Sequence, residues 1–368
     1  MIVEKLSLHN FRNYENEKIE FDKRINIIYG NNAQGKTNIL EAIYLFSLGK
    51  SNRALKDSEL LRFGEKKSEI KMDFLSKGRE FKGKIVLEES KRKKIFLNDI
   101  PIRKNSELVG NLNVVFFGPE YLSLIKEGPK RRRKNLDVMI CQLKPAYLSA
   151  ISEYKRINEQ KSSLLKNDRI DEVFLSVLNE KILELAVYIT KMRFEYIKKI
   201  EKIANVLQLE ISEGKESLSM KYISSGIYIN DENVENLFVL FGKKMLELSK
   251  REMKYRECVF GPHRDDIEFF VNGTDLKSFG SQGQQKTSIL VQKIAEIELF
   301  FEESGEYPVL LLDDIMSELD KKRQEFIINK IKKGQIFITS TDSEKFECLS
   351  SGKFLRIDKG RMIECISI

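Results

Sequence analysis

The residues best suited to chemistry lie near the N-terminus, where small and amide residues precede a lysine and a threonine. The run matches the phosphate-binding pattern G-x-x-x-x-G-K-[ST] and comprises Gly30, Asn31, Asn32, Ala33, Gln34, Gly35, Lys36 and Thr37. Its glycines allow the backbone to curl so that successive N–H groups face a phosphate. Lys36 would reach the terminal phosphates, and the Thr37 hydroxyl would ligate Mg²⁺. The pattern predicts a nucleoside triphosphate site; the alternative is a glycine-rich turn without a ligand.

A second run places two carboxylates directly after four apolar residues, 309–312. A buried strand would hold Asp313 beside the phosphate-binding loop, where it could bind Mg²⁺ directly or through water. Asp314 could then polarise the attacking water, so Asp314 and Lys36 are the predicted catalytic residues. The alternative, a solvated strand end, is disfavoured by the phosphate-binding pattern upstream.

A third segment, FGSQGQQKTSIL, has the features of a helix N-terminus. Ser281 is a capping residue, Gly283 adds flexibility, and Gln284 opens a helical run. Taken alone, the segment could be a capped surface helix. Its position matters more: a phosphate-binding loop, a long insertion, this segment, and an acidic strand end about 25 residues later follow the order found in ABC-type ATPases.

Short strands and helices must position these groups. Residues 25–29 are expected to form a strand that leads into the phosphate-binding loop. Residues 36–48 are expected to form a helix that leads out of the loop, and Asn38 in its first turn is expected to belong to the nucleotide site. Asn98-Asp99 predicts a hairpin turn. Further strands are expected at residues 2–8, 84–87, 114–117, 268–271, 309–312 and 336–339.

The middle of the chain has a helical period instead. Apolar residues step by three or four between residues 170 and 207, which predicts one helix of about 38 residues. A preceding helix at residues 148–164 would pack against it as a hairpin. An ordinary helical bundle fits the same apolar pattern equally well. We therefore expect an α/β head with a helical arm inserted, divided as residues 1–130, 131–250 and 251–368.

Composition restricts the class of protein further. The 368 residues are 41% hydrophobic and 33% charged with a net charge of +8, typical of a globular chain with a polyanionic partner. Apolar runs are too short to cross a bilayer and no signal-peptide pattern is present, so we expect a cytoplasmic protein without a membrane partner. Basic runs at residues 91–94 and 130–134 could bind phosphates or form solvated turns. Widely spaced cysteines predict free thiols at Cys141, Cys258, Cys348 and Cys365.

Together, GNNAQGKT, SQGQQKT and LLDDIMSELD resemble the ATPase head shared by SMC and RecF proteins. Other segments resemble the RecF family in particular. These are residues 10–14 (NFRNY), 117–122 (FGPEYL) with 130–133 (KRRR), and 261–266 (GPHRDD). The resemblance extends from about residue 2 to residue 341. His263 and Arg264 of the last segment could have a functional role, or they could equally form a structural salt bridge to Asp265 or Asp266.

The resemblance implies a mechanism with ATP and Mg²⁺ as cofactors. Each head would bind ATP through its own phosphate-binding loop, with Arg12 adding a contact, while Ser281, Gly283 and Gln284 of a second subunit cap the γ-phosphate. Ser317 and Asp320 would lie at the same homodimer interface. The implied role is ATP-dependent DNA binding at gaps and stalled forks, on duplexes and double-strand/single-strand junctions. RecR would be a partner there, and RecA would be loaded indirectly.

Departures from the wider ABC pattern predict slow ATP hydrolysis, and the resemblance implies that the hydrolysis depends on DNA. Asp314 stands where that pattern has glutamate, and residues 338–341 provide hydroxyl groups where it has a histidine. Residues 117–120 lack the glutamine found in many relatives. The alternatives are a transporter's nucleotide-binding subunit or an SMC-like structural tether. The first needs a membrane partner, and the second needs coiled coils of hundreds of residues.

Overall fold

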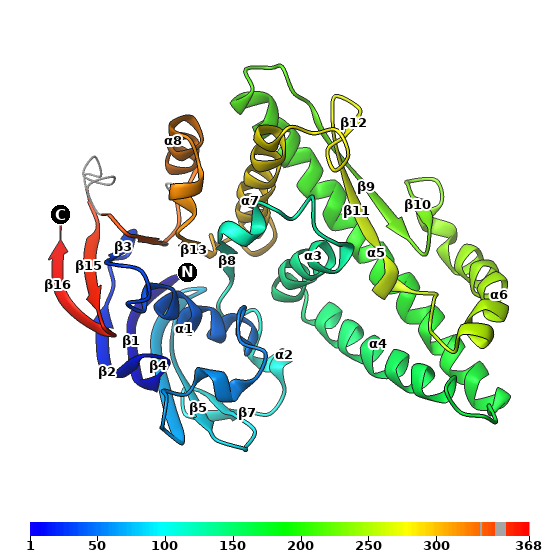
Figure 1. Ribbon diagram of the computed structural model, residues 1–368, viewed down its shortest axis with the longest axis horizontal. Coiled ribbons are helices and arrows are strands. Elements are labelled where there is room, and N and C mark those ends of the chain that lie inside the picture. The colour runs from blue at the N-terminus through cyan, green and yellow to red at the C-terminus, as the bar shows by residue number, and fades with distance from the viewer. Residues whose placement is uncertain (332, 343–350, 368) are drawn as a thin grey trace. The chain divides into compact units, whose positions relative to one another are not determined.

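A computed structural model describes residues 1–331, 333–342 and 351–367. The chain divides into two compact units, each of which is described by itself. The head unit comprises Met1–Tyr121 and Glu296–Ile368, and the arm unit comprises Leu122–Ala295. Figure 1 follows the chain through both units.

One sheet of the head unit is antiparallel, with strand order β2-β1-β4-β5-β6-β7. Its strands are β1 (Ile2–Phe11), β2 (Tyr14–Glu20), β4 (Lys67–Ser76), β5 (Arg79–Glu88), β6 (Lys94–Leu97) and β7 (Ile100–Ile102). Every second residue of β4 is buried, as the period of a strand with one covered face requires. The predicted hairpin joins β6 and β7, and Asn98 and Asp99 both have positive φ angles, of 50° and 64°.

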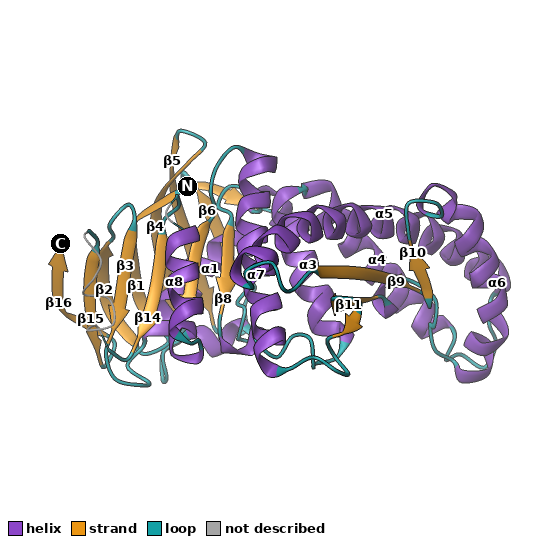
Figure 2. Cartoon of the chain, turned by 90° about the horizontal axis from the view of Figure 1, so that it is seen from above, coloured by secondary structure: helices purple, strands orange, loops and turns teal. Residues whose placement is uncertain are grey.

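The second sheet of the head unit carries the chemistry, in the order β16-β15-β3-β14-β13-β8. Its strands are β3 (Ile25–Tyr29), β8 (Val114–Phe117), β13 (Val309–Asp313), β14 (Ile336–Ser340), β15 (Lys353–Asp358) and β16 (Arg361–Ser367). All neighbouring pairs except β15–β16 are parallel. The strands run side by side in Figure 2. Because parallel strands end at one edge, the residues following β3 and β13 are brought close together.

Helix α1 (Lys36–Leu48) has the predicted bounds and forms the centre of the head core. Residues 39–47 are all buried, which fits a helix covered on every side. It ends at Gly49 in the left-handed conformation, a common helix stop. Two smaller helices, α2 (Asn105–Leu108) and α8 (Lys321–Lys330), complete the head unit.

The arm unit is built on the predicted pair of long helices. Helix α5 (Glu172–Ile211) has 40 residues and packs along α4 (Pro145–Leu164), as Figure 1 shows. Helices α3 (Pro129–Leu143) and α6 (Leu237–Tyr255) pack against the same pair, and the helix α7 (Gln282–Ser304) begins in this unit. The inserted helical arm is therefore present.

Strand β2 and two further groups of strands were not predicted. The arm contains a sheet with the order β10-β9-β11-β12, made of β9 (Leu218–Ser224), β10 (Ile227–Ile229), β11 (Asp266–Val271) and β12 (Thr274–Asp275). Only β11 was expected; β9 and β10 lie in a region that we expected to be helical. In the head unit, β15 and β16 follow residue 341, beyond the last predicted element.

Candidate nucleotide-binding site

The phosphate-binding loop, residues 30–37, has a backbone that only glycine accommodates at two positions. Gly30 and Gly35 have φ angles of 146° and 114°. A Cβ atom on Gly30 would lie 2.3 Å from the carbonyl oxygen of Ile357, and one on Gly35 would lie 2.7 Å from the Asn13 side chain. The loop leads from β3 directly into the N-terminus of α1. Its N–H groups and the helix dipole therefore combine at one point, which suits an anion.

Side chains from the N-terminal hairpin hold this loop in place. Asn13 donates from Nδ2 to the carbonyl oxygen of Gln34 at 2.7 Å and accepts from Asn38 Nδ2 at 2.9 Å. The Tyr14 hydroxyl donates to the carbonyl oxygen of Gly35 at 3.1 Å. Asn38 therefore supports the loop through its side chain. Asn13 and Tyr14 were noted only for family resemblance, because sequence spacing does not reveal such long-range contacts.

The C-terminal strands support the loop from another direction. The amide of Lys359, in the turn between β15 and β16, donates to Gln34 Oε1 at 2.6 Å. The amide of Gly360 donates to the carbonyl oxygen of Gln34 at 3.0 Å. The last strands of the chain thus help to shape a site whose residues lie more than 300 positions earlier.

Lys36 lies against its own loop. Its ammonium donates to the carbonyl oxygens of Gly30 at 2.6 Å and Asn31 at 2.9 Å. Burial lowers the pKa of Lys36, and the nearby carboxylates of Asp314 and Asp313 partly oppose that shift. Lys36 is thus close enough to interact electrostatically with Asp313 and Asp314, the two acidic residues predicted to lie beside the phosphate-binding loop.

Asp313 is the centre of a hydrogen-bonded group. Its Oδ1 accepts from the hydroxyl of Thr37 at 2.8 Å and from the hydroxyl of Thr339 at 2.8 Å. Thr339 lies opposite Asp313 in the β13–β14 ladder, so the sheet register fixes this contact. The Thr339 hydroxyl also accepts from the amide of Asp314 at 2.9 Å. Thr339 is a site residue that the sequence indicated only as one of several hydroxyl groups.

The oxygen donors gathered here fit a magnesium ion. A threonine hydroxyl and a carboxylate, Thr37 and Asp313, are held within hydrogen-bond distance by α1 and β13. Mg²⁺ prefers such oxygen ligands and usually takes only one or two protein ligands when it binds a nucleotide. The predicted metal ligands are therefore brought together by the fold.

The backbone turns sharply after β13. Asp314 adopts a left-handed conformation with φ 52° and precedes a short 3-10 helix, Ile315–Glu318. Ser317 donates to the carbonyl oxygen of Asp314 at 2.8 Å, and Asp320 caps α8 through the amide of Arg323 at 2.9 Å. Both residues thus stabilise the turn after β13; their predicted place at a dimer interface stays a prediction.

Arg12 makes contacts within the head unit. Its guanidinium forms two bonds of 2.9 Å with the buried carboxylate of Glu41 and a third with the carbonyl oxygen of Glu59 at 2.7 Å. The ion pair ties the end of β1 to α1. The predicted contact of Arg12 with nucleotide stays a prediction.

The signature segment forms the capped helix start that the sequence predicted. The amide of Gln284 donates to Ser281 Oγ at 3.2 Å, and the amide of Ser281 donates to Gln284 Oε1 at 3.0 Å, which is a capping box. Gly283 is the second residue of α7. Ser281 is exposed, so its end of the helix is accessible in the arm unit. The role of the three residues in binding nucleotide stays a prediction.

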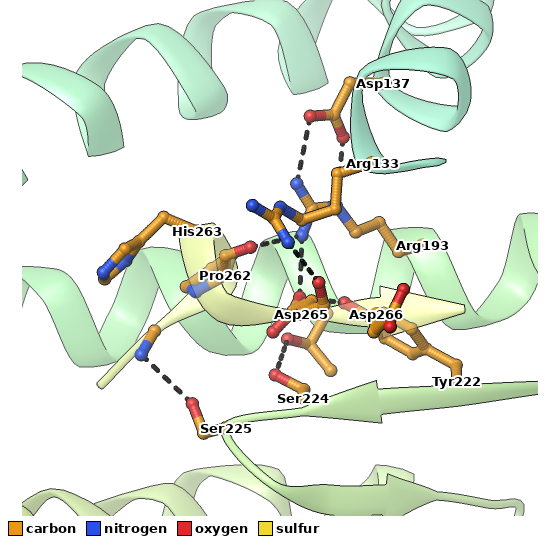
Figure 3. A network of polar contacts seen from close by, with 12 residues as sticks. Arg133, Asp137, Arg193, Tyr222, Ser224, Ser225, Pro262, His263, Asp265 and Asp266 are labelled. Carbon is orange, nitrogen blue, oxygen red and sulfur yellow. Dashed lines mark hydrogen bonds and ion pairs between the residues drawn. The ribbon is translucent and has the colours of Figure 1, made fainter. Parts of the chain in front are cut away.

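The GPHRDD segment belongs to a buried polar network in the arm unit, shown in Figure 3. Arg193, only 2% exposed, bonds Asp137 through two contacts of 3.0 Å and Asp265 Oδ2 at 2.7 Å. It also donates to the carbonyl oxygen of Pro262 at 2.8 Å. Burial raises the pKa of Tyr222, which stays a neutral donor to Asp265. The guanidinium of Arg193 in α5 thus joins α3 to the segment that leads into β11.

The partners of this segment differ from those expected. His263 contacts the hydroxyl of Tyr154 through Nδ1 at 2.5 Å, and burial lowers the pKa of His263. Arg264 pairs with Glu257. The carboxylates of Asp265 and Asp266 instead bind Arg193 and Arg132, two arginines distant in sequence. The salt bridges are structural, as one interpretation proposed, but they involve other cations.

The two basic runs are partly occupied inside the fold. Arg132, 2% exposed, pairs with Asp266 at 2.8 Å, and Arg133 donates to the carbonyl oxygen of Asp265. In the other run, Lys93 pairs with Asp57 at 2.8 Å. Exposed members remain in both runs, including Lys130 and Arg92. The runs as wholes are therefore not simple phosphate-binding patches.

Two further expectations can be compared with the structure. Among residues 1–331, 333–342 and 351–367, no helix combines the length and apolar character needed to cross a bilayer. Cys141, Cys258 and Cys365 are free thiols, as predicted, whereas Cys348 lies outside the described residues.

Comparison with known proteins defines the class. The profile of the family described as RecF/RecN/SMC N terminal domain matches residues 2–361. The chain is similar to a SMC head bound to a domain of ScpA, with a TM-score of 0.59 over 100% of this chain and 98% of that one, although identity is only 19%. That likeness shows the fold alone. The head is an ABC-type ATPase head of the SMC kind, as predicted.

Closer relatives narrow the class to one family. The DNA replication and repair protein RecF of Acetivibrio thermocellus is 42% identical over 372 residues, covering 98% of this chain and 99% of that protein. The RecF of Clostridium kluyveri is 41% identical, with coverage of 98% and 99%. A solved structure described as the recombination mediator protein RecF-ATPrS in the RecFOR pathway has a TM-score of 0.90 at 35% identity, covering 98% and 97%. A RecF-ATP structure gives 0.88 at 34% identity, covering 100% and 97%. The chain belongs to the RecF family of DNA replication and repair proteins.

Proposed function

We propose that the chain binds ATP with Mg²⁺, closes into a homodimer around the nucleotide, and acts on DNA as a repair ATPase. The observation that carries the proposal is the hydrogen bond of 2.8 Å between Thr37 and Asp313. It joins the end of the phosphate-binding loop to the acidic strand end, 276 residues later, in the arrangement that Mg²⁺-dependent nucleotide binding requires. The relatives described as RecF-ATP and RecF-ATPrS support the choice of nucleotide.

Each residue of the head site has a role in this proposal. Lys36 would exchange its bonds to loop carbonyls for the terminal phosphates, while the loop amides bind the remaining phosphate oxygens. Thr37 and Asp313 would hold Mg²⁺. ATP, when bound, supplies the phosphoryl group that is transferred to water. Asp314 would orient the attacking water, and Thr339 would position Asp313 and the Asp314 backbone.

The second half of each ATP site would come from the partner subunit. Ser281, Gly283 and Gln284 open α7 at an accessible helix N-terminus, which favours an anion such as the γ-phosphate. Large apolar side chains close in sequence to each half of the site are exposed. Phe279, which precedes the cap of α7, is 77% exposed. Leu55 and Phe63, which follow α1 in the head unit, are 95% and 103% exposed. Closure of two subunits would cover such side chains.

With RecR, the dimer would promote RecA loading at single-strand gaps and stalled forks, on duplexes and double-strand/single-strand junctions, in the cytoplasm. The RecFOR pathway named for the comparison structures supports RecR as a partner. Hydrolysis would be slow, because Asp314 is one methylene shorter than the glutamate of the wider pattern. Hydrolysis would also depend on DNA and would act as the step that releases the dimer. The division into residues 1–130, 131–250 and 251–368 stays a prediction.

Sedimentation of the full chain with and without ATP and Mg²⁺ tests the proposal. We expect wild type to become dimeric only with both. Ser281→Arg should remain monomeric, because the bulky cation blocks the cap that meets the partner's nucleotide. Binding of a fluorescent ATP analogue to the Ser281→Arg monomer should be unchanged, since the head site lies in the other unit.

Two outcomes would contradict the proposal. A wild-type chain that stays monomeric with saturating ATP, Mg²⁺ and DNA would exclude the closed dimer. A Ser281→Arg chain that dimerises normally would show that the signature segment does not complete the site.

A further inference from the structure

A recess in the arm unit gathers positive charge around one wall of α6. It has a volume of about 450 Å³, within the range of small-molecule sites, and all its lining residues belong to the arm. Lys244, Leu248, Arg251 and Tyr255 line it from successive turns of α6. Arg264 lines it from the GPHRDD segment. The spacing of four and three residues places the α6 side chains on one helix face.

The charge of this wall is only partly neutralised within the fold, although Glu257 itself lines the recess. Helix α6 carries five lysine or arginine residues against two glutamates, Glu247 and Glu252. Glu252 is buried and paired with Lys161, so it does not offset the exposed cations. Among the described residues, Arg251 forms no ion pair. Only Glu247 and Glu257 pair with cations of the recess, Lys244 and Arg264.

The opposite wall is held rigidly. Glu252 Oε1 accepts from the amides of Val259 at 2.9 Å and Phe260 at 3.2 Å, which fixes the chain after α6. Ser225, in the tight turn between β9 and β10, accepts from the amide of Gly261 at 3.1 Å. Val259 and Ser225 both line the recess. This side of the recess is therefore fixed by hydrogen bonds to the backbone.

An aromatic ring lies at the end of the cationic wall. Tyr255 is 60% exposed, and the cations of Arg251 and Lys254 lie over its ring, 5.8 Å and 5.5 Å from the ring centre. An exposed aromatic ring with cations around it suits single-stranded nucleic acid, since the cations can turn from the ring to a phosphate while a base stacks on the ring. A duplex hides its base faces. An acidic peptide would satisfy the cations but would leave the ring without a planar partner.

We propose that this recess binds one nucleotide unit of single-stranded nucleic acid, with its base stacked on Tyr255 and its phosphate held by Arg251, Lys244 and Arg264. The inference rests on the proposed function in one respect, that nucleic acid is the partner. It places the bound single strand of nucleic acid at α6, which lies outside both basic runs identified in the sequence. The arm would thus contact the unpaired strand of a junction.

Anisotropy titrations of the full chain test this site. The probes are a labelled 15-nucleotide oligo(dT) and a 15-base-pair duplex, each at two salt concentrations. Tyr255→Leu should raise the Kd for oligo(dT) about 5- to 100-fold, because one base loses its stacking partner. It should leave the Kd for the duplex unchanged. Arg251→Gln should weaken oligo(dT) binding and reduce its salt slope by about 0.7, the value for one phosphate contact.

A matched control separates the recess from general charge. Lys250 is exposed on α6 but lies outside the lining, so Lys250→Gln removes the same charge elsewhere on the helix. We expect it to change the Kd for oligo(dT) by less than about twofold at physiological salt, where such charges are screened. Competition by dTMP would show that the recess accepts a single nucleotide unit, and competition by oligonucleotide alone would show that binding needs a strand; both support the recess chemistry.

The results that would contradict the recess proposal differ from those that would contradict the proposed function. Tyr255→Leu that binds oligo(dT) like wild type would exclude stacking, and equal losses for Lys250→Gln and Arg251→Gln would exclude a defined phosphate contact. A poly-glutamate peptide that displaces oligo(dT) from wild type but not from Arg251→Gln would show a peptide site. ATP-dependent dimerisation, measured in the same samples, should persist in every variant, and its absence in wild type would refute the proposed function alone.

Discussion

The phosphate-binding loop of the head and the Arg193 network of the arm both combine cations with carboxylates, yet they use them differently. Arg193 donates to Asp137, Asp265 and a backbone carbonyl, all within its own unit. Lys36 donates only to carbonyl oxygens of its own loop, and two of the three ammonium hydrogens are engaged there. The first arrangement holds helices and strands together, whereas the second leaves a cation available for phosphate.

The difference shows why a dense charged segment is not by itself a functional site. GPHRDD has more charged residues than GNNAQGKT, but its carboxylates are bonded to buried arginines of α3 and α5. A buried charge is stable only when its partners satisfy it, so each member of this network depends on the others. The phosphate-binding loop is held by Asn13 and Tyr14, which leaves its own groups oriented toward a ligand.

The largest effect is expected from breaking the arm network. Arg193→Met would leave Asp137 and Asp265 without their cation, which should reduce the free energy of unfolding by about 3–5 kcal/mol. The control is Lys198→Met on the same helix, which removes an exposed pair with Asp231 and should cost about 0–1 kcal/mol. Urea unfolding measures both. Equal stability of the two variants would show that the network does not hold the arm.

The head site should respond in the opposite way. Lys36→Ala should weaken ATP binding about 10- to 100-fold, since a charged hydrogen bond to phosphate is lost. Its free energy of unfolding should barely change, because water can satisfy the carbonyl oxygens of Gly30 and Asn31. Calorimetric titration with Mg²⁺-ATP and urea unfolding test the pair of expectations. Unchanged ATP affinity would remove Lys36 from the site and weaken the contrast with Arg193.

Thr339 tests the link between β14 and the acidic strand end. Thr339→Val keeps the shape but removes the hydroxyl that serves Asp313 and the Asp314 amide. We expect a loss of about 1–2 kcal/mol in the free energy of unfolding, because a partly buried amide loses its acceptor, together with slower ATP hydrolysis. Thr341→Val, at an exposed neighbour, is the control. Equal hydrolysis rates for the two variants would mean that Thr339 does not position the catalytic carboxylates.

The smallest effect is expected at the exposed edge of the basic run in α3. Lys130→Gln should change the free energy of unfolding by less than about 0.5 kcal/mol, as for most surface substitutions. Arg132→Gln should behave like Arg193→Met, because Arg132 is buried against Asp266. Thermal unfolding separates the two. A large loss for Lys130→Gln would show that the run acts as one structural unit.

Local patterns predicted much of the fold. The bounds of α1 and the length of α5 follow from helical periods, and the strand β13 follows from its apolar run. The proximity of Thr37 to Asp313 also follows, because the parallel strands β3 and β13 end at one edge of the sheet. These features depend on residues near in sequence or on a general rule of sheet geometry.

What could not be predicted depends on contacts between distant segments. Strand β15 pairs with β3 across more than 320 residues, and no local period announces that pairing. The partners of Asp265 and Asp266 come from α3 and α5, so the choice of Arg193 over the adjacent Arg264 is a property of the fold. Thr339 acquires its role only through the register of two strands.

A mixing experiment tests the shared ATP site most directly. Lys36→Ala subunits keep an intact signature segment, and Ser281→Arg subunits keep an intact phosphate-binding loop. Sedimentation with ATP and Mg²⁺ should find each variant monomeric alone and a dimer in the mixture, because one complete site forms between unlike subunits. Wild-type amounts of dimer from either variant by itself would contradict a site completed by the partner.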